Sequence, residues 1–129
     1  MRKFTDGWLG RVRIGTSMTV LMYMLPPLLR KLKTEHPQLE INLKAGLTVA
    51  TLAMLKSNAL DLGLCAMPVE DQAFETVPLL TDELVAILPA GMRDTPKRVT
   101  PAFLARCPLI LGNEQSALRQ AASAWLSTH

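Results

Sequence analysis

The chain has 129 residues, of which 49% are hydrophobic and 19% are charged, and its formal net charge is +3. This composition is typical of a folded domain with one core and a small second lobe, and it excludes a disordered, collagen-like or low-complexity chain. The small excess of positive charge is scattered along the chain, which does not indicate a nucleic-acid-binding surface.

The first predicted element is a short strand. Residues 1–9 contain two basic side chains without an apolar stretch behind them, so they lack the pattern of a secretion signal. Residues 11–15 alternate polar and apolar side chains and stop at a glycine, which predicts a strand. A stretch rich in hydroxyl side chains, residues 16–19, follows this strand directly.

An amphipathic helix is predicted next. Its apolar face is formed by leucines at helical spacing: Leu21, Leu25, Leu28, Leu29 and Leu32. Pro37 disfavours helical geometry in the residue before it, so the helix should end near His36. Pro26 and Pro27 allow two starting points, because the helix either begins at Pro27 or begins near Thr19 and kinks at the prolines. We favour the earlier start with a kink.

Strand and helix alternate again in the following segment. Residues 39–44 alternate apolar and polar side chains, which predicts a second strand that is closed by Gly46. Thr48 is placed to cap a helix that stops at Asn58, with its inner face formed by Val49, Leu52 and Leu55. Residues 60–67 are mostly apolar and predict a third strand that is covered on both faces. Three strands joined by two helices predict an α/β fold with a parallel sheet and right-handed crossovers.

The remaining residues predict a second, smaller part of the chain. Residues 77–80 and 84–88 are strand candidates, and the second of them ends at Pro89. Residues 90–98 are polar and contain a glycine and a proline, which we interpret as the boundary between two lobes.

Beyond this boundary two helices and a strand are expected. Thr100 caps a short helix that has Pro101 at its first position and Phe103 and Leu104 on its inner side. Residues 109–111 are a strand candidate, and Ser116 caps the last helix.

Two strand-to-helix corners are the candidate functional site. Residues 15–19 and residues 46–48 each combine a glycine with hydroxyl side chains, at a point where helix N–H groups are free. In a parallel sheet both corners lie at the same edge, so together they could hold a small anion or a polar carbonyl compound. Taken singly, the hydroxyls of Ser17, Thr19 and Thr48 could serve only as helix caps. Met67 and Pro68, at the end of the third strand, form either part of the cleft or ordinary packing.

Catalytic, metal-binding and membrane functions are poorly supported. A nucleophile needs a neighbouring base, and neither His36 nor His129 is placed near the hydroxyl clusters by the sequence pattern. Cys65 and Cys107 are far apart in sequence and lack metal-ligand spacing, so we interpret them as small apolar side chains of a protein from a reducing cytoplasm. The apolar run of residues 18–29 is too short to span a bilayer. We therefore expect no enzyme, no metal, no cofactor and no membrane contact.

An ordered set of short motifs resembles the effector-binding domain of LysR-type transcriptional regulators. The match runs in order from Gly10 to about Leu111. Each motif is short, but the ordered set of motifs at these spacings is specific to the family. They are Gly10-Arg11-Val12-Arg13-Ile14-Gly15, Leu25-Pro26, His36-Pro37 with Leu39 and Ile41, Gly46-Leu47-Thr48, Leu60-Asp61-Leu62-Gly63 and Glu83-Leu84-Val85-Ala86-Ile87-Leu88-Pro89.

The resemblance implies a periplasmic-binding-protein-like fold of type II, in which two α/β lobes enclose a small effector that is often an organic anion. It places residues 10–89 in the first lobe and residues 90–129 in a partial second lobe. It also assigns the effector-contacting residues, the cleft wall and the hinge. These are Thr16, Ser17, Thr19 and Thr48 for the effector, Met67 and Pro68 for the wall, and Leu88 and Pro89 for the hinge.

The chain also departs from the family pattern. The resemblance assigns residues 1–9 to the end of a linker, so the helix-turn-helix module through which such regulators contact DNA is absent from this chain. The second lobe stops after its first helix, and the strand that returns to the first lobe is missing. We therefore expect a truncated domain that forms a homodimer or a swapped oligomer to cover its open sheet edges. Two other interpretations stay open, a solute-binding receptor of a transporter and an α/β enzyme.

Overall fold

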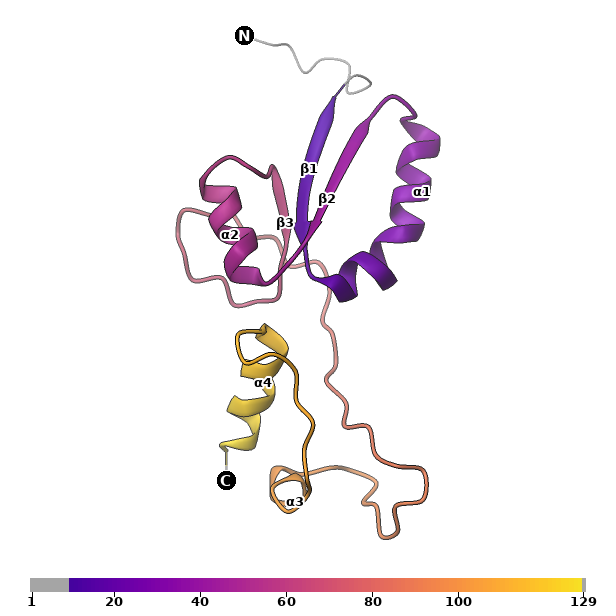
Figure 1. Cartoon of the computed structure of the whole chain (residues 1–129), viewed down its shortest axis with the longest axis vertical. Helices are drawn as coiled ribbons and strands as arrows, with labels where there is room; N and C mark the ends of the chain where they lie inside the picture. The colour runs from indigo at the N-terminus through magenta and orange to yellow at the C-terminus, as the bar shows by residue number, and fades with distance from the viewer. Residues whose placement is uncertain (1–9, 129) are drawn as a thin grey trace. The chain divides into compact units, whose positions relative to one another are not determined.

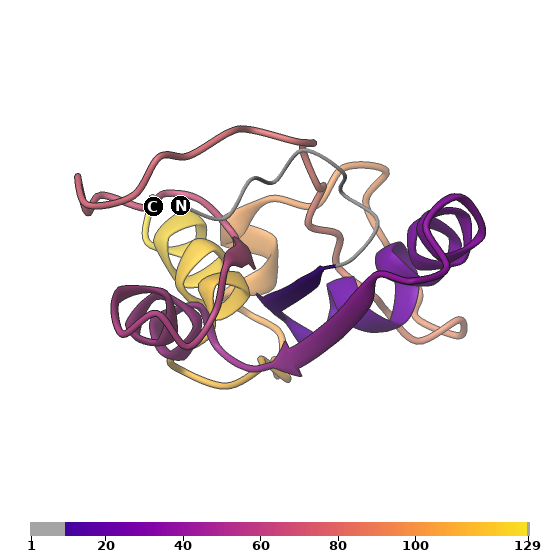
Figure 2. The same ribbon diagram turned by 90° about the horizontal axis from the view of Figure 1, so that it is seen from above.

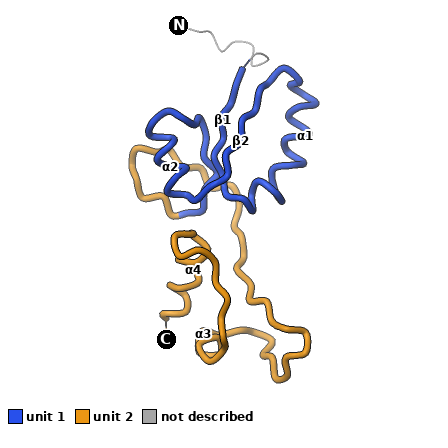
Figure 3. The backbone as a smooth tube through the Cα atoms, viewed as in Figure 1, with its two compact units in different colours: residues 1–67 blue, residues 68–129 orange. Residues whose placement is uncertain are grey.

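The computed structural model describes residues 10–128, which divide into two compact units between Met67 and Pro68 (Figure 3). The first unit alternates strands and helices, as Figure 1 shows. Its elements are β1 (Arg11–Thr16), η1 (Val20–Met24), α1 (Leu25–Glu35), β2 (Glu40–Ala45), α2 (Thr48–Lys56) and β3 (Leu62–Leu64).

The sheet of the first unit is parallel and has the strand order β2-β1-β3. The chain leaves β1 toward one neighbour and later crosses back to the other neighbour, so right-handed crossovers place their helices on opposite faces. Figures 1 and 2 show this arrangement, with α1 on one side of the sheet and α2 on the other. The predicted α/β fold with a parallel sheet is therefore confirmed for this unit.

The helix before β2 begins early, as the sequence predicts. Helical backbone starts at Met18, and a π-helical segment, η1, precedes α1. Leu25 N–H donates to Val20 O, five residues back, just before Pro26 and Pro27, which have no N–H group to donate. The wider turn of η1 accommodates the two prolines, which cannot donate backbone hydrogen bonds. The helix bends where η1 meets α1 (Figure 1).

The end of α2 explains why Asn58 stops the helix. Asn58 adopts a left-handed backbone with φ 56°. Ala59 N–H donates to Met54 O at 2.8 Å, and Asn58 N–H donates to Leu55 O at 3.1 Å. These two bonds form the Schellman motif, which satisfies the last carbonyls of a helix and favours glycine or asparagine at the left-handed position.

The core of the first unit is partly polar. Among residues 10–67, the buried apolar side chains are Ile14, Leu25 and Leu60. Thr16 and Thr51 are each only 1% exposed. The prediction that Val49 lies on the inner face of α2 is wrong, because Val49 is 70% exposed and Thr51 takes the inner position instead.

Several strand predictions are wrong in length or existence. The third strand is shortened from residues 60–67 to Leu62–Leu64, and it is not covered on both faces, since Leu62 is exposed. Residues 77–80, 84–88 and 109–111 form no strand. An apolar run becomes a strand only beside a partner with free hydrogen-bonding groups, and in the described residues these runs have none. Most of their side chains are consequently exposed, Ile87 by 91%, whereas Leu88 and Leu111 are half-buried.

The second unit contains two helices, α3 (Pro101–Leu104) and α4 (Ala117–Leu126). Both begin with the side-chain caps that the sequence predicts. Thr100 Oγ1 accepts a hydrogen bond from Phe103 N–H, and Ser116 Oγ accepts one from Arg119 N–H. The unit begins at Pro68, before the lobe boundary predicted after Pro89, so that boundary stays a prediction.

Candidate functional site

The two predicted corners lie side by side at the carboxyl edge of the sheet. Thr16, the last residue of β1, is in register with Ala45, the last residue of β2. The strands stay joined beyond this point, because Gly46 N–H donates to Thr16 O at 2.8 Å. Both corners therefore lie outside the carboxyl ends of parallel strands, which is the edge where ligands bind in open α/β sheets.

The first corner contains one structural hydroxyl and two exposed ones. Thr16 is buried, and its Oγ1 donates to Leu64 O at 3.2 Å, which ties β1 to β3. Ser17 is exposed, and its Oγ accepts a hydrogen bond from Val20 N–H at 3.3 Å, as a helix cap does. Thr19 is exposed and caps no backbone group. Ser17 and Thr19 are therefore the accessible hydroxyls of this corner.

The second corner leaves the Thr48 hydroxyl available. Thr48 is the first residue of α2, and the N-cap position belongs to Leu47, so the prediction that Thr48 caps this helix is wrong. The side chain of Thr48 is half-buried and makes no hydrogen bond to any residue that the structure describes. Together with the free N–H groups of the first turn of α2, it presents hydrogen-bond donors at the positive end of a helix.

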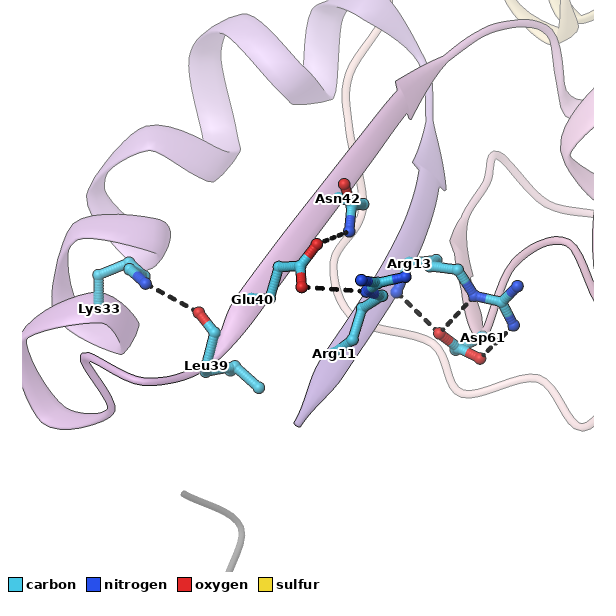
Figure 4. Close-up of polar contacts among 7 residues, drawn as sticks. All are labelled: Arg11, Arg13, Lys33, Leu39, Glu40, Asn42 and Asp61. Atoms are coloured by element: carbon cyan, nitrogen blue, oxygen red, sulfur yellow. Dashed lines mark hydrogen bonds and ion pairs between the residues drawn. The ribbon is translucent and has the colours of Figure 1, made fainter. Parts of the chain in front are cut away.

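Two ion pairs connect β1 to the segments on either side of it, as Figure 4 shows. The Asp61 carboxylate accepts hydrogen bonds from Arg13 at its backbone N–H (2.8 Å), Nε (3.1 Å) and Nη2 (2.9 Å). These bonds, led by the one from the side chain, lower the pKa of Asp61 from 3.8 to about 2.

Glu40 forms the second ion pair. Its carboxylate accepts a hydrogen bond from Asn42 Nδ2 at 3.1 Å, and its Oε2 lies 3.1 Å from Arg11 Nε. The Asn42 bond contributes most to lowering the Glu40 pKa, followed by the bond from Arg11. Both ion pairs therefore hold their carboxylates ionised, and both involve the first half of β1 rather than its carboxyl end.

Two glycines near the site pack against α2, a contact that was not predicted from the sequence. Gly15 and Gly63 are register partners on β1 and β3, and Thr51 of α2 lies against both of them. The sequence contains a usable signal, because glycine in the middle of a strand often marks a close approach of another backbone. The buried threonine opposite them shows no comparable pattern in the sequence.

The other predicted site residues lie further along the chain. Met67 ends the first unit and is 54% exposed, and Pro68 begins the second unit. Leu88 is half-buried and Pro89 is exposed, and both lie in the second unit. Their roles in the cleft wall and the hinge stay predictions.

Other kinds of site find no support in the part of the chain that the structure describes. Residues 10–128 hold no group of three or more histidine, cysteine, aspartate or glutamate side chains placed to bind a metal ion. Both cysteines are free and half-buried, and burial raises the pKa of the Cys65 thiol. Over the same residues, every helix is too short or too polar to cross a bilayer.

Comparison with known proteins identifies similar chains. A family described as the LysR substrate binding domain matches residues 5–129. A probable hydrogen peroxide-inducible genes activator of Mycobacterium avium is 34% identical over 119 residues, which are 92% of this chain and 38% of that protein. A malonate utilization transcriptional regulator of Klebsiella pneumoniae is 34% identical over 95 residues, which are 71% of this chain and 31% of that protein.

A solved structure is similar in fold as well. A mutant OxyR2 regulatory domain from Vibrio vulnificus is 28% identical, with a TM-score of 0.51 over 54% of this chain and 33% of that one. This chain spans less than two fifths of the length of the two curated relatives.

Proposed function

This chain belongs to the family of LysR substrate-binding domains, which have a periplasmic-binding-protein-like fold, and from that premise we propose that it is the effector-sensing part of a bacterial transcriptional regulator. The observation that carries the proposal is the pair of adjacent strand ends. The corner after β1 carries the exposed Ser17 and Thr19, and the corner after β2 carries Thr48, whose hydroxyl makes no hydrogen bond within residues 10–128. The relatives described above are regulators, which favours this role over that of a transporter receptor.

The chemistry of the corners favours a small anionic effector. Helix N–H groups and hydroxyls donate hydrogen bonds and carry partial positive charge, which suits a carboxylate or sulfate. The regulator from Klebsiella pneumoniae is named for malonate utilization, so malonate is a suitable first probe.

The proposed response is a shift between conformations. An effector that binds a closed arrangement of the lobes more tightly than an open one shifts the population toward the closed form. In a longer regulator this shift would change how a helix-turn-helix module is presented to DNA. We place this activity in the cytoplasm and assign it no catalytic step.

A ligand screen with a single substitution tests the site. Malonate, sulfate and sugar acids are compared by thermal shift, and binders of the parent are then measured by isothermal titration calorimetry. Thr48→Ala is expected to weaken binding about tenfold to a hundredfold, because a lost hydrogen bond to a charged group costs about 1.5–3 kcal/mol. The control is Thr34→Ala, whose hydroxyl donates to Arg30 O on an exposed part of α1. Undiminished binding by Thr48→Ala removes Thr48 from the site.

Self-association is the expected response to open sheet edges. In the described residues β2 and β3 each pair with β1 alone, so each has an outer edge without a neighbouring strand. Such edges attract another chain. Size-exclusion chromatography with light scattering is expected to give at least twice the 14.2 kDa of one chain. A stable single chain at micromolar concentration would contradict this proposal.

A further inference from the structure

Neighbouring glycines leave a bare patch of backbone under α2. Gly15 of β1 and Gly63 of β3 are register partners, so two adjacent strands lack side chains at the same level of the sheet. A Cβ atom added at Gly15 would lie 2.8 Å from Thr51 Cγ2, and one added at Gly63 would lie 3.0 Å from the same atom. The Thr51 methyl group therefore occupies the space that alanine at either position would need.

This contact sets how closely α2 approaches the sheet. Thr51 is 1% exposed, which leaves its side chain little room to move aside. The Cβ added at Gly63 would also lie 2.9 Å from Leu55 Cδ1, one turn further along α2. Any side chain at Gly63 would consequently push on the face of α2 that carries Thr51 and Leu55.

The first residue of α2 is coupled to the same contact. Thr48 precedes Thr51 by three residues, so the two lie on one face of the helix. Thr51 N–H donates to Leu47 O at 3.0 Å, which joins Thr51 to the corner that carries Thr48. If Thr51 were pushed away from the sheet, the start of α2 would move with it. The Thr48 hydroxyl and the free N–H groups of that helix would then lie farther from the corner that follows β1.

We propose that Gly15, Gly63 and Thr51 form a packing contact that positions the N-terminus of α2 for effector binding. They are positioning residues, because they act through the placement of Thr48 and the helix amides and not by touching the effector. The inference rests on the proposed function. It adds that the affinity of the site depends on the spacing between the sheet and α2.

The positioning is tested by adding a methyl group on the sheet and then removing the methyl group that faces it on α2. Gly63→Ala is expected to weaken the binding of malonate and sulfate about tenfold, because a shifted helix leaves polar groups of the site without partners. Thr51→Ser removes the opposing methyl group of the buried Thr51, and the half-buried Leu55 can turn the end of its side chain away from the added Cβ. The Gly63→Ala/Thr51→Ser double variant is therefore expected to bind within about threefold of the parent. Thr51→Ser alone is the reference for the double variant, and Gly10→Ala, whose added Cβ would lie 3.8 Å from Leu39 Cδ1, is the control. Affinities are measured by titration calorimetry in concentrated sucrose, which favours the folded state.

The outcomes separate this inference from the proposed function. A folded Gly63→Ala variant with a lower melting temperature but an unchanged dissociation constant has only a structural defect, and that result overturns the inference. If Gly63→Ala does not fold, the test depends on the double variant alone. Binding by the double variant that is about tenfold weaker than that of the parent then overturns the inference. If the parent binds neither malonate nor sulfate, the proposed function fails for anions, and the inference fails with it.

Discussion

Replacing Gly15 with alanine is expected to lower the free energy of unfolding by about 1–3 kcal/mol, which is the usual result of forcing an extra methyl group into a packed interior. The added Cβ would lie 2.5 Å from Leu60 Cδ1 and 2.8 Å from Thr51 Cγ2. Leu60 and Thr51 are themselves buried, so neither side chain can move aside cheaply. Because a loss of about 1–3 kcal/mol is a large fraction of the stability of an ordinary small domain, about 5–15 kcal/mol, the change should be clearly visible in urea unfolding followed by circular dichroism.

Gly10→Ala is the matched control for this prediction. Gly10 directly precedes β1, and its added Cβ would meet only Leu39 Cδ1, at an ordinary contact distance of 3.8 Å. Because Gly→Ala also reduces the entropy of the unfolded chain, this control is expected to be neutral or to stabilise by less than about 1 kcal/mol. Equal unfolding midpoints for the two variants would show that the contact under α2 is loose.

The elements with local signals are the ones that the sequence predicts well. Alternation in residues 11–15 and 39–44 corresponds to β1 and β2, and a left-handed Asn58 ends α2 as expected. Each of these signals is contained within a few residues. Residues 77–80 and 84–88 have the composition of strands, but a strand also needs a partner, which a local pattern does not reveal.

Some features of the site are predicted by local sequence patterns, whereas others depend on residues that are distant in sequence. The adjacency of the two corners follows from parallel pairing, which the strand and helix alternation predicts. The burial of Thr16 does not, because its hydroxyl is engaged by Leu64 O, a partner 48 residues away. Likewise, the role of Thr51 depends on two glycines from different strands, so its importance becomes visible only in three dimensions.

Asp61→Asn is expected to destabilise the protein at neutral pH and to flatten its loss of stability in acid. The Asp61 carboxylate has a pKa of about 2 in the folded protein, below its ordinary value of 3.8, because of its hydrogen bonds from Arg13. A group with a lowered pKa stabilises the folded state above its ordinary pKa, and this stabilisation is lost as the pH falls toward the folded value. The parent should therefore exceed the variant in stability above pH 3.8, and the difference should shrink as the pH approaches 2.

The measurement is the difference in free energy of unfolding between parent and variant, from urea titrations at several pH values. Glu40, whose pKa is also lowered, titrates in both proteins and cancels in this difference. Asp82→Asn is the control, because Asp82 makes no hydrogen bond or ion pair with any described residue. Both side chains of the Arg13–Asp61 pair are partly exposed, so added salt should weaken the effect. A difference that stays constant from neutral pH to pH 2 would mean that the Arg13–Asp61 bonds do not depend on the charge of the carboxylate.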